Sequence, residues 1–198
     1  MEGLARGLHA CPRSGALVWR SPPAHFVSRP QALEPALSIV EKIADERLEF
    51  FLDRDFDEAV ARASKGMAPP SLLHRYAELH EMGFAHSFEL RNASGQLAAG
   101  GYGVAVGRVF VTLAVSGEAS LRAALMARLE CELTRLQFAM HDCLAPVGAP
   151  EGFAPLPRNE YFAQLVANSG GGRLGRWQAQ SQRSAALTPH VDLRKRAA

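Results

Sequence analysis

LHEMGFAHSFEL, at residues 79–90, carries the chain from a helical pattern into a strand pattern. Gly83 lies where the helical pattern ends, and glycine closes a helix without the strain that another residue would meet there. GGYGV, at residues 100–104, follows in the next segment, where missing side chains permit a bulge or the close approach of another backbone. The sequence therefore predicts a helix that leads directly into a sheet.

The chain after Gly83 alternates between strand and helix signals. Turn residues separate segments with β-branched content, which predicts an antiparallel meander. The expected elements are strands at 85–91, 96–106 and 109–115, a helix at 117–138 capped by Ser116, a strand at 140–144 and a helix at 158–167. Strands and helices in this order form an α+β domain.

The chain before Gly83 predicts further helices. Asp55 stands three residues before Glu58, which is the arrangement of a capping box, and Ser71 can cap a helix that runs to residue 82. The other expected elements are a short helix beginning near Pro35 and a strand at 48–52. We expect an extended N-terminal segment with a short helix over 1–44, an α+β domain over 45–168 and a mobile tail over 169–198.

Composition narrows the class of protein. The chain has 198 residues with 47% hydrophobic content, enough for a sizeable core, and a net charge of +2, too small to indicate a nucleic-acid partner by itself. It has no apolar run of the ~20 residues that a membrane span needs and no secretory signal pattern, so we expect a cytoplasmic protein. The cysteines form no CxxC pair, and His74, His80 and His86 lack the spacing of zinc ligands, so no metal site is expected.

Several motifs follow one another in a specific order. The chain shows a helix ending LHEMG, a strand beginning AHSFEL, the GGYGV strand, a long helix, Asp142-Cys143, and Pro157-Arg158 before Tyr161. Over residues 70–165 this order resembles the leucyl/phenylalanyl-tRNA–protein transferases. The resemblance implies an acetyltransferase-like (GNAT) α+β fold, with a mixed, largely antiparallel sheet and helices on both faces. The family's small N-terminal domain is matched only at Trp19-Arg20-Ser21-Pro22, so a truncated N-terminal extension is expected.

The resemblance implies a tRNA-dependent aminoacyltransferase. Such an enzyme moves leucine or phenylalanine from charged tRNA to the N-terminal Arg or Lys of a protein, in the N-degron pathway of protein degradation. The implied partners are aminoacyl-tRNA and the acceptor's N-terminus, with no cofactor, metal or membrane. The reaction needs an apolar pocket for the aminoacyl side chain, a proton acceptor for the attacking amine, and an acidic patch for the cationic first residue of the acceptor.

Candidate binding residues follow from the same resemblance. The positions that match the family's side-chain pocket are Phe110, Val115, Met126, Leu129 and Leu133. Their spacing is also that of ordinary core residues, so both interpretations stay open. Gly101 and Tyr102 belong to the glycine-rich strand, where an aminoacyl substrate can approach the backbone. The arginines expected to contact tRNA phosphates are Arg20, Arg158 and Arg176.

The proton-accepting positions depart from the family. Leu113 and Leu144 occupy the positions of a glutamate and a glutamine, and Asp142 is the polar group that still matches. Leucine accepts no proton, so impaired catalysis is expected. Glu118 follows the lost glutamate closely and can substitute for it, or it is an acid that stabilises the first turn of a helix. The candidate catalytic residues are Asp142 and Glu118.

The sequence leaves two other functions open. The chain can be a family-derived protein that has lost catalysis and binds a peptide N-terminus or tRNA. It can also be an N-acyltransferase that uses acyl-CoA on the same fold. Against the second alternative, the strand-to-helix turn at residues 115–118 lacks the glycine-rich, basic sequence that holds a pyrophosphate.

Overall fold

The computed structural model describes residues 9–13, 16–20, 22–30, 47–65, 68–143, 152–171, 175 and 177. Most of them belong to a seven-stranded sheet with the order β4-β5-β6-β7-β8-β3-β9. Its strands are β3 (Ala24–Ser28), β4 (Glu49–Leu52), β5 (Ala85–Arg91), β6 (Leu97–Val106), β7 (Val109–Ser116), β8 (Met140–Cys143) and β9 (Ala154–Pro157). All neighbouring pairs are antiparallel except β7 and β8, which run parallel. A separate hairpin joins β1 (His9–Arg13) to β2 (Ala16–Arg20).

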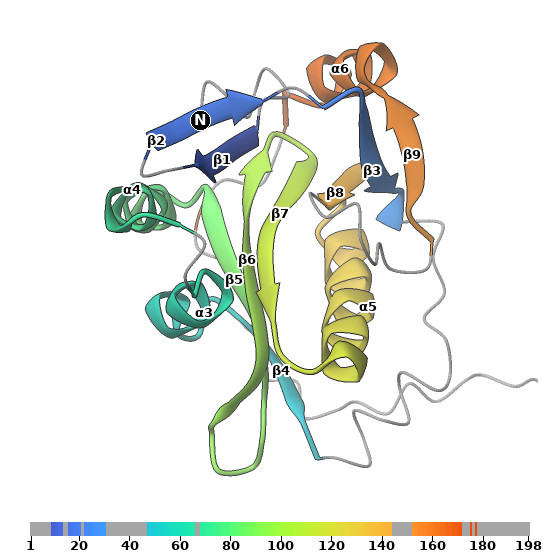
Figure 1. The fold of residues 1–198 in the computed structure, drawn as a ribbon. Helices are drawn as coiled ribbons and strands as arrows, with labels where there is room; N and C mark the ends of the chain where they lie inside the picture. Colours follow the sequence, from blue (N-terminus) through green and yellow to red (C-terminus); the bar gives the residue numbers. More distant parts are fainter. Residues whose placement is uncertain are drawn as a thin grey trace, which may run out of the picture.

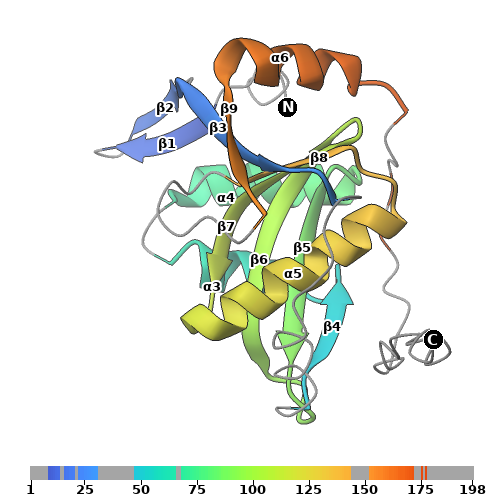
Figure 2. The same cartoon turned by 90° about the vertical axis from the view of Figure 1, so that its right-hand side faces the viewer.

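Helices cover both faces of the sheet (Figures 1 and 2). α5 (Ala119–Arg135) lies along one face, and α3 (Phe56–Ala63) and α4 (Pro70–Glu81) lie against the other. α6 (Arg158–Ala167) packs against β3 and β9. None of the described helices is long and apolar enough to cross a membrane. This arrangement confirms the predicted α+β class with a mixed, largely antiparallel sheet.

Two apolar cores fill the space between the helices and the sheet. We call the cluster under α5 the α5-side core, which includes Phe88, Phe110, Leu129, Phe138 and Trp177. We call the cluster on the other face the α3-side core, which includes Phe56, Tyr76, Tyr102, Val111 and Tyr161. Successive residues of a strand point to opposite faces, so the central strands contribute to both cores.

The predicted junctions at Asp55 and Gly83 are confirmed. Oδ1 of Asp55 accepts a hydrogen bond of 3.0 Å from the backbone N–H of Glu58 and so caps α3. Gly83 follows α4 with a φ of +77°, in the left-handed region that favours glycine. A Cβ at this position would lie 2.7 Å from the backbone of Gly175, so the glycine also admits a later segment of the chain.

Two predicted helix caps are wrong. Ser71 lies inside α4, because a proline at the first helical position has a suitable φ and needs no side-chain cap. Ser116 ends β7 instead, and its hydroxyl donates a hydrogen bond of 3.0 Å to the carbonyl of Gly100. The chain turns at Gly117, whose φ is +120°, and α5 begins after Glu118.

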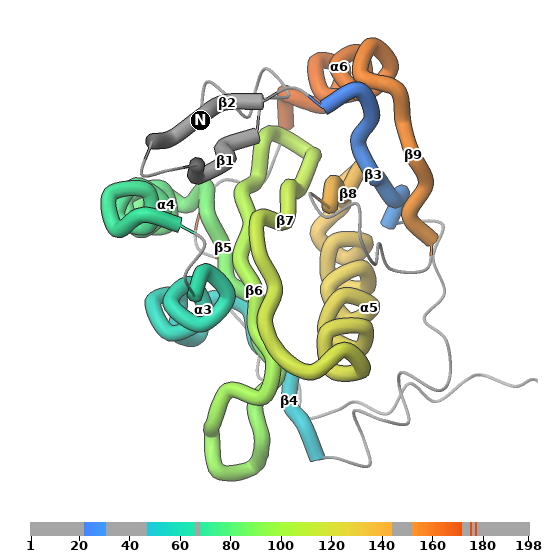
Figure 3. Tube along the Cα trace, viewed as in Figure 1, coloured from blue at the N-terminus to red at the C-terminus, as the bar shows by residue number. Residues whose placement is uncertain are grey.

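Two strands of the sheet were not predicted. β3 comes from the segment expected to be an extended lead-in, and it lies between β8 and β9 (Figure 3). β9 comes from a stretch expected to be a loop, and its prolines are tolerated because the strand lies at the edge of the sheet. The sheet thus extends beyond the 45–168 range. The short helix expected near Pro35 lies outside the described residues.

The segment expected to be a mobile tail docks on the domain at Trp177. The Trp177 side chain is 6% exposed, lies in the α5-side core and stacks on the ring of His86 with 3.7 Å between ring centroids. Its backbone N–H donates a hydrogen bond of 3.1 Å to Oδ2 of Asp53. The tail was expected to be mobile unless docked, and Trp177 is a docked residue, because its ring buries a large apolar surface.

Candidate functional site

The described pairing between the parallel strands β7 and β8 ends next to a bulge. The last described pair between them joins Thr112 to Cys143. The next residue of β7, Leu113, is left without a partner on β6, because the register shifts between Tyr102 and Gly103. Both features favour a site here, since bulges occur beside active sites and ligands bind at the carboxyl ends of parallel strands.

Asp142 lies on β8 beside this point and is fully buried. Its Oδ2 lies 2.9 Å from Nδ1 of His25 on β3. The His25 ring stacks on that of Tyr161 from α6, with 3.5 Å between centroids and 2° between planes. We call His25, Asp142 and Tyr161 the Asp142 cluster. Burial and, after it, the charge of Asp142 raise the pKa of the Tyr161 phenol well above its usual range, so the phenol stays protonated.

A second polar cluster is built around His141, the preceding residue of β8. Its Nδ1 is hydrogen-bonded to Oε1 of Glu130 on α5, and its Nε2 lies 2.7 Å from the hydroxyl of Thr112. Ser28 on β3 donates a hydrogen bond of 2.9 Å to the same oxygen of Glu130. We call Ser28, Thr112, Glu130 and His141 the His141 cluster. Each of these residues is at most 5% exposed.

The two clusters lie on opposite faces of β8. Neighbouring residues of a strand point to opposite sides of a sheet, so His141 and Asp142 diverge. The His141 ring faces the α5-side core, where it lies 5.7 Å from the ring of Phe110 and 5.1 Å from that of Phe153. The Asp142 cluster ends on Tyr161, which belongs to the α3-side core.

Comparison with known proteins assigns the chain to a family. The family model described as leucyl/phenylalanyl-tRNA protein transferase matches residues 27–166, from β3 to the end of α6. The chain belongs to this transferase family. A leucyl/phenylalanyl-tRNA–protein transferase from Aromatoleum aromaticum is 31% identical over 180 residues, which cover 83% of this chain and 73% of that relative.

Other comparisons extend this result. A protein of the same name from Nitrosospira multiformis is 33% identical over 164 residues, covering 75% of this chain and 68% of that relative. Another from Alkalilimnicola ehrlichii is 29% identical over 161 residues, covering 75% of this chain and 62% of that relative. The solved structure of L-PGS from Bacillus licheniformis matches 65% of this chain and 48% of its own, with a TM-score of 0.40 and 9% identity, which is too low to define a shared fold.

The positions that match the transferase family's side-chain pocket come together in the α5-side core. They are Phe110, Val115, Met126, Leu129 and Leu133. Four of them are at most 3% exposed, and Val115 is half-buried at the margin of the cluster. The ring of Trp177 lies 5.4 Å from that of Phe110. These residues therefore form one packed apolar cluster, as both the pocket and the core interpretations predicted.

Gly101 and Tyr102 do not extend this cluster in the way we expected. Tyr102 faces the α3-side core, where its hydroxyl lies 2.7 Å from that of Ser64, so it is on the opposite face from the pocket positions. A Cβ at Gly101 would lie 2.5 Å from the Phe88 ring and 2.8 Å from the carbonyl oxygen of Ala114. The space left by this glycine is thus filled by the protein itself, and the expected substrate contact stays a prediction.

Glu118 reaches neither polar cluster. It is exposed at the N-terminus of α5, and its Oε1 accepts a hydrogen bond of 3.0 Å from the hydroxyl of Ser120. Asp142 pairs with Val111, and from there β7 runs on to Ser116, roughly 16 Å away at the usual rise per residue of a strand. Of the two roles expected for Glu118, the structure places it where an acid stabilises the first turn of a helix, and its catalytic role stays a prediction.

Among the arginines expected to contact tRNA, the structure describes the side chain of Arg158. It is exposed at the start of α6, and its Nε donates a hydrogen bond of 2.9 Å to the carbonyl of Pro22. Its backbone N–H donates one of 3.0 Å to the carbonyl of Pro23. These bonds join α6 to the segment before β3. The side chain of Arg20 and all of Arg176 lie outside the described residues, so their roles stay predictions.

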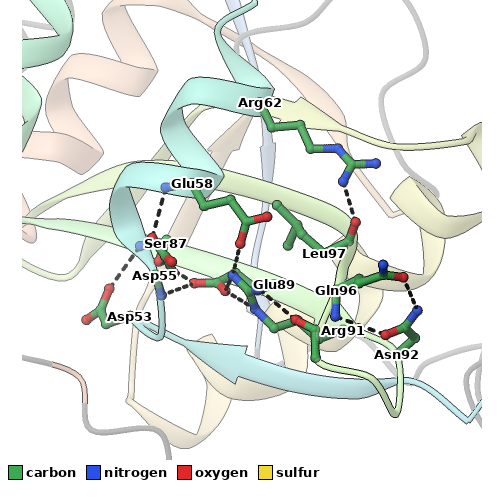
Figure 4. Close-up of polar contacts among 11 residues, drawn as sticks. Asp53, Asp55, Glu58, Arg62, Ser87, Glu89, Arg91, Asn92, Gln96 and Leu97 are labelled. Atoms are coloured by element: carbon green, nitrogen blue, oxygen red, sulfur yellow. Dashed lines mark hydrogen bonds and ion pairs between the residues drawn. The ribbon is translucent and has the colours of Figure 1, made fainter.

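The AHSFEL motif contributes a structural ion network (Figure 4). Glu89 is fully buried and accepts hydrogen bonds from the Ser87 hydroxyl at 2.9 Å, from Nε of Arg91 at 2.7 Å and from the backbone N–H of Asp55 at 2.9 Å. Arg91 also pairs with Glu58 at 2.7 Å. The network fastens the start of α3 to β5. Within the described ranges no group of three or more His, Cys, Asp or Glu side chains is arranged to hold a metal ion.

Proposed function

We propose that this chain transfers leucine or phenylalanine from charged tRNA to the N-terminal Arg or Lys of a protein, in the cytoplasm, as part of an N-degron pathway. Membership of the family over residues 27–166 and the names of the relatives support this proposal. The observation that carries it is the position of Asp142, the residue that matches the family motif, beside the last described pair of β7 and β8 and the bulge at Leu113. One parallel pair in an antiparallel sheet also supports a GNAT-like arrangement.

The proposed reaction exchanges an ester for an amide. The acceptor's α-amino nitrogen attacks the carbonyl carbon that joins the amino acid to the tRNA ribose. A C–N bond forms, the ester C–O bond breaks, and the proton lost by the nitrogen balances the one gained by the ribose oxygen. A group near the amine must hold this proton after the nitrogen loses it and before the ribose oxygen gains it. The family's two acceptor positions cannot do so here, because they are Leu113 and Leu144.

The transferase is expected to be slow because Leu113 occupies one of the family's proton-accepting positions. Leu113 is the bulge residue of β7, and its half-buried side chain packs against the α3-side core. Loss of one positioned proton acceptor commonly lowers a rate ~10²–10⁴-fold. Asp142 is fully buried and engaged with His25, so it supports the site through its neighbours rather than by contact with the amine. Leu144 lies outside the described residues.

The substrates are proposed to bind on the α5 side. The leucyl or phenylalanyl side chain enters the cluster at Val115, its half-buried margin, and has to displace packed neighbours such as Trp177. Phosphates of the tRNA bind Arg20, Arg158 and Arg176. Because phosphate contacts release counterions, binding of charged tRNA weakens steeply as salt concentration rises.

The test is incubation of the protein with leucyl-tRNA or phenylalanyl-tRNA and a peptide that begins with Arg. The expected product is the peptide extended by one residue, detected by mass spectrometry, with an N-acetylated copy of the same peptide as the unreactive control. Absence of product with both charged tRNAs at stoichiometric protein would contradict the proposal. Binding of charged tRNA without product would then favour a non-catalytic role, and acylation of the peptide by acyl-CoA would favour the acyltransferase alternative.

A further inference from the structure

The His141 cluster is a chain of hydrogen bonds that ends on a hydroxyl group. Glu130 bonds Nδ1 of His141, and Nε2 of the same ring lies 2.7 Å from Oγ1 of Thr112. A carboxylate beside Nδ1 favours the tautomer with the proton on that nitrogen, which leaves Nε2 as an acceptor for the Thr112 hydroxyl. An acid, an imidazole and a hydroxyl in this order activate the hydroxyl for proton transfer.

One feature of Glu130 indicates that this cluster has a role beyond packing. Its second oxygen, Oε2, is buried and has no hydrogen-bond partner among the described residues. An unmatched buried carboxylate oxygen costs free energy, and apolar residues of similar volume are often as stable or more stable at such a place. A negative charge held beside His141 is useful when the imidazole gains a proton, because it stabilises the imidazolium.

The hydroxyl of Thr112 lies where the proposed reaction takes place. Thr112 is the last described partner of β8 on β7 and directly precedes the bulge at Leu113. Two positions after Phe110 on the same strand, it shares the face of the α5-side core. Its side chain is therefore part of the wall beside which the aminoacyl group is proposed to bind. Thr112 is 2% exposed, so the proposed contact requires packed side chains of the α5-side core to move when the substrate binds.

We propose that Thr112 takes the proton of the attacking amine and passes its own hydroxyl proton to His141; this inference rests on the proposed function. As the C–N bond forms, a proton leaves the nitrogen for Oγ1 of Thr112 while the hydroxyl proton moves to Nε2 of His141, and Glu130 faces the imidazolium. As the ester C–O bond breaks, the proton returns through Thr112 to the ribose oxygen. Thr112 is a catalytic residue in this scheme, and His141 and Glu130 are positioning residues that act through it.

Substitution of Thr112 tests the hydroxyl. Thr112→Val removes the hydroxyl and keeps the shape of the side chain, whereas Thr112→Ser keeps the hydroxyl. In single-turnover transfer from leucyl-tRNA to an Arg peptide, we expect a loss of ~10² or more for Thr112→Val and of less than ~10-fold for Thr112→Ser. Thr134→Val is the matched control, because it removes a hydroxyl that bonds backbone carbonyls, that of Pro30 at 2.7 Å and that of Glu130 at 2.9 Å. Its rate is expected to stay within ~2-fold of wild type.

A pH profile separates proton transfer from a merely structural role. The described titratable group that contacts His141 is Glu130 from α5, and the neighbouring β3 and β7 contribute the hydroxyls of Ser28 and Thr112. The acceptor's own α-amino group has to be deprotonated, so the rate rises with pH in wild type and in His141→Gln alike. His141→Gln is expected to lower the rate and to change the shape of this profile, because the relay no longer contributes its proton-transfer step. An unchanged profile together with a wild-type rate in His141→Gln would overturn the relay.

The outcomes distinguish the relay from the function on which it rests. Wild-type and Thr112→Val transfer at equal rates would overturn the relay alone. A wild-type chain that transfers nothing would overturn both the proposed function and the relay. Circular dichroism and charged-tRNA binding establish that each variant is folded, and if Thr112→Val fails to fold, the Thr112→Ser rate and the His141→Gln pH profile decide in its place.

Discussion

The two polar clusters on β8 are alike in composition and different in how they end. Each joins a buried histidine to a carboxylate. In the Asp142 cluster the imidazole of His25 stacks on the ring of Tyr161, whereas in the His141 cluster the imidazole faces the hydroxyl of Thr112 at 2.7 Å. Stacking fixes the position of the His25 ring, while the Thr112 hydroxyl lies within hydrogen-bond distance of the His141 imidazole and can carry a proton onward. The residue that matches the family motif is thus on the side that holds the structure, and the proton route lies on the other.

The largest expected effect comes from restoring the family's acceptors. Leu113→Glu together with Leu144→Gln should raise the transfer rate by ~10²–10⁴, because proton-accepting groups return to the family's two acceptor positions. Leu113 packs on the α3 side, so this route bypasses the His141 cluster, and adding Thr112→Val should then cost far less than it does alone. Single-turnover transfer to an Arg peptide measures both effects.

A control for the added charge is Leu73→Glu, at another half-buried leucine of the α3-side core. This substitution is expected to leave the rate no higher than wild type. A double variant that is no faster than wild type would mean that the slow rate has another cause than the lost acceptors.

The next effect concerns Trp177, whose side chain packs in the α5-side core, on the same face of the sheet as the His141 ring. Trp177→Ala is expected to lower the free energy of unfolding by about 3–5 kcal/mol, because it removes a buried ring that contacts Phe110, Phe138 and His86. Met82→Ala is the control, since Met82 is 64% exposed and should change stability by less than ~0.5 kcal/mol. Denaturant unfolding measures both, and equal stability of Trp177→Ala and wild type would show that the segment does not dock in solution.

A smaller effect, the pH dependence of unfolding, tests the structural role of the Asp142 cluster. The pKa of Tyr161 is raised by burial and by Asp142, so above about pH 10 the unfolded chain releases this proton while the folded chain keeps it. The free energy of unfolding therefore falls as pH rises in that range. Tyr161→Phe should make the fall shallower, as measured by urea unfolding between neutral and alkaline pH. An unchanged slope would contradict the assignment.

The smallest effect lies at Arg158, on the helix that supports the Asp142 cluster. Arg158→Ala should weaken binding of leucyl- and phenylalanyl-tRNA alike and should reduce the slope of log affinity against log salt by ~1. Filter binding at several salt concentrations measures the slope. Arg75→Ala, at an exposed α4 arginine paired with Glu78 at 2.8 Å, serves as the control. Equal slopes in wild type and Arg158→Ala would remove Arg158 from the tRNA surface.

Local signals explain what the sequence could predict of the fold. The elements from residue 48 to 143 are marked by caps, glycines and periodicity within a few residues, and most of their bounds were predicted closely. β3 and β9 lacked such signals, because short strands between prolines become strands only when the distant β8 and each other supply partners. Trp177 was a detectable signal, since it is a lone large aromatic residue in an otherwise polar tail.

The residues of the candidate site likewise divide into those with a local sequence signal and those without one. Asp142 was predicted through the motif that surrounds it. The His141 cluster was not predicted, because Ser28 and Glu130 are 102 positions apart in the sequence and meet only in the folded chain. Glu118 was close to the lost glutamate in sequence and distant from Asp142 in space, since β7 continues to Ser116 before the chain turns into α5.

The most direct test of the account makes the same change in both clusters. His25→Gln and His141→Gln each replace one buried imidazole, on opposite faces of the sheet around β8. Single-turnover transfer from leucyl-tRNA to an Arg peptide should fall by ~10² or more in His141→Gln and by less than ~10-fold in His25→Gln, with both variants folded and able to bind charged tRNA. A larger loss in His25→Gln, with His141→Gln near the wild-type rate, would place the proton route on the Asp142 side and contradict the account.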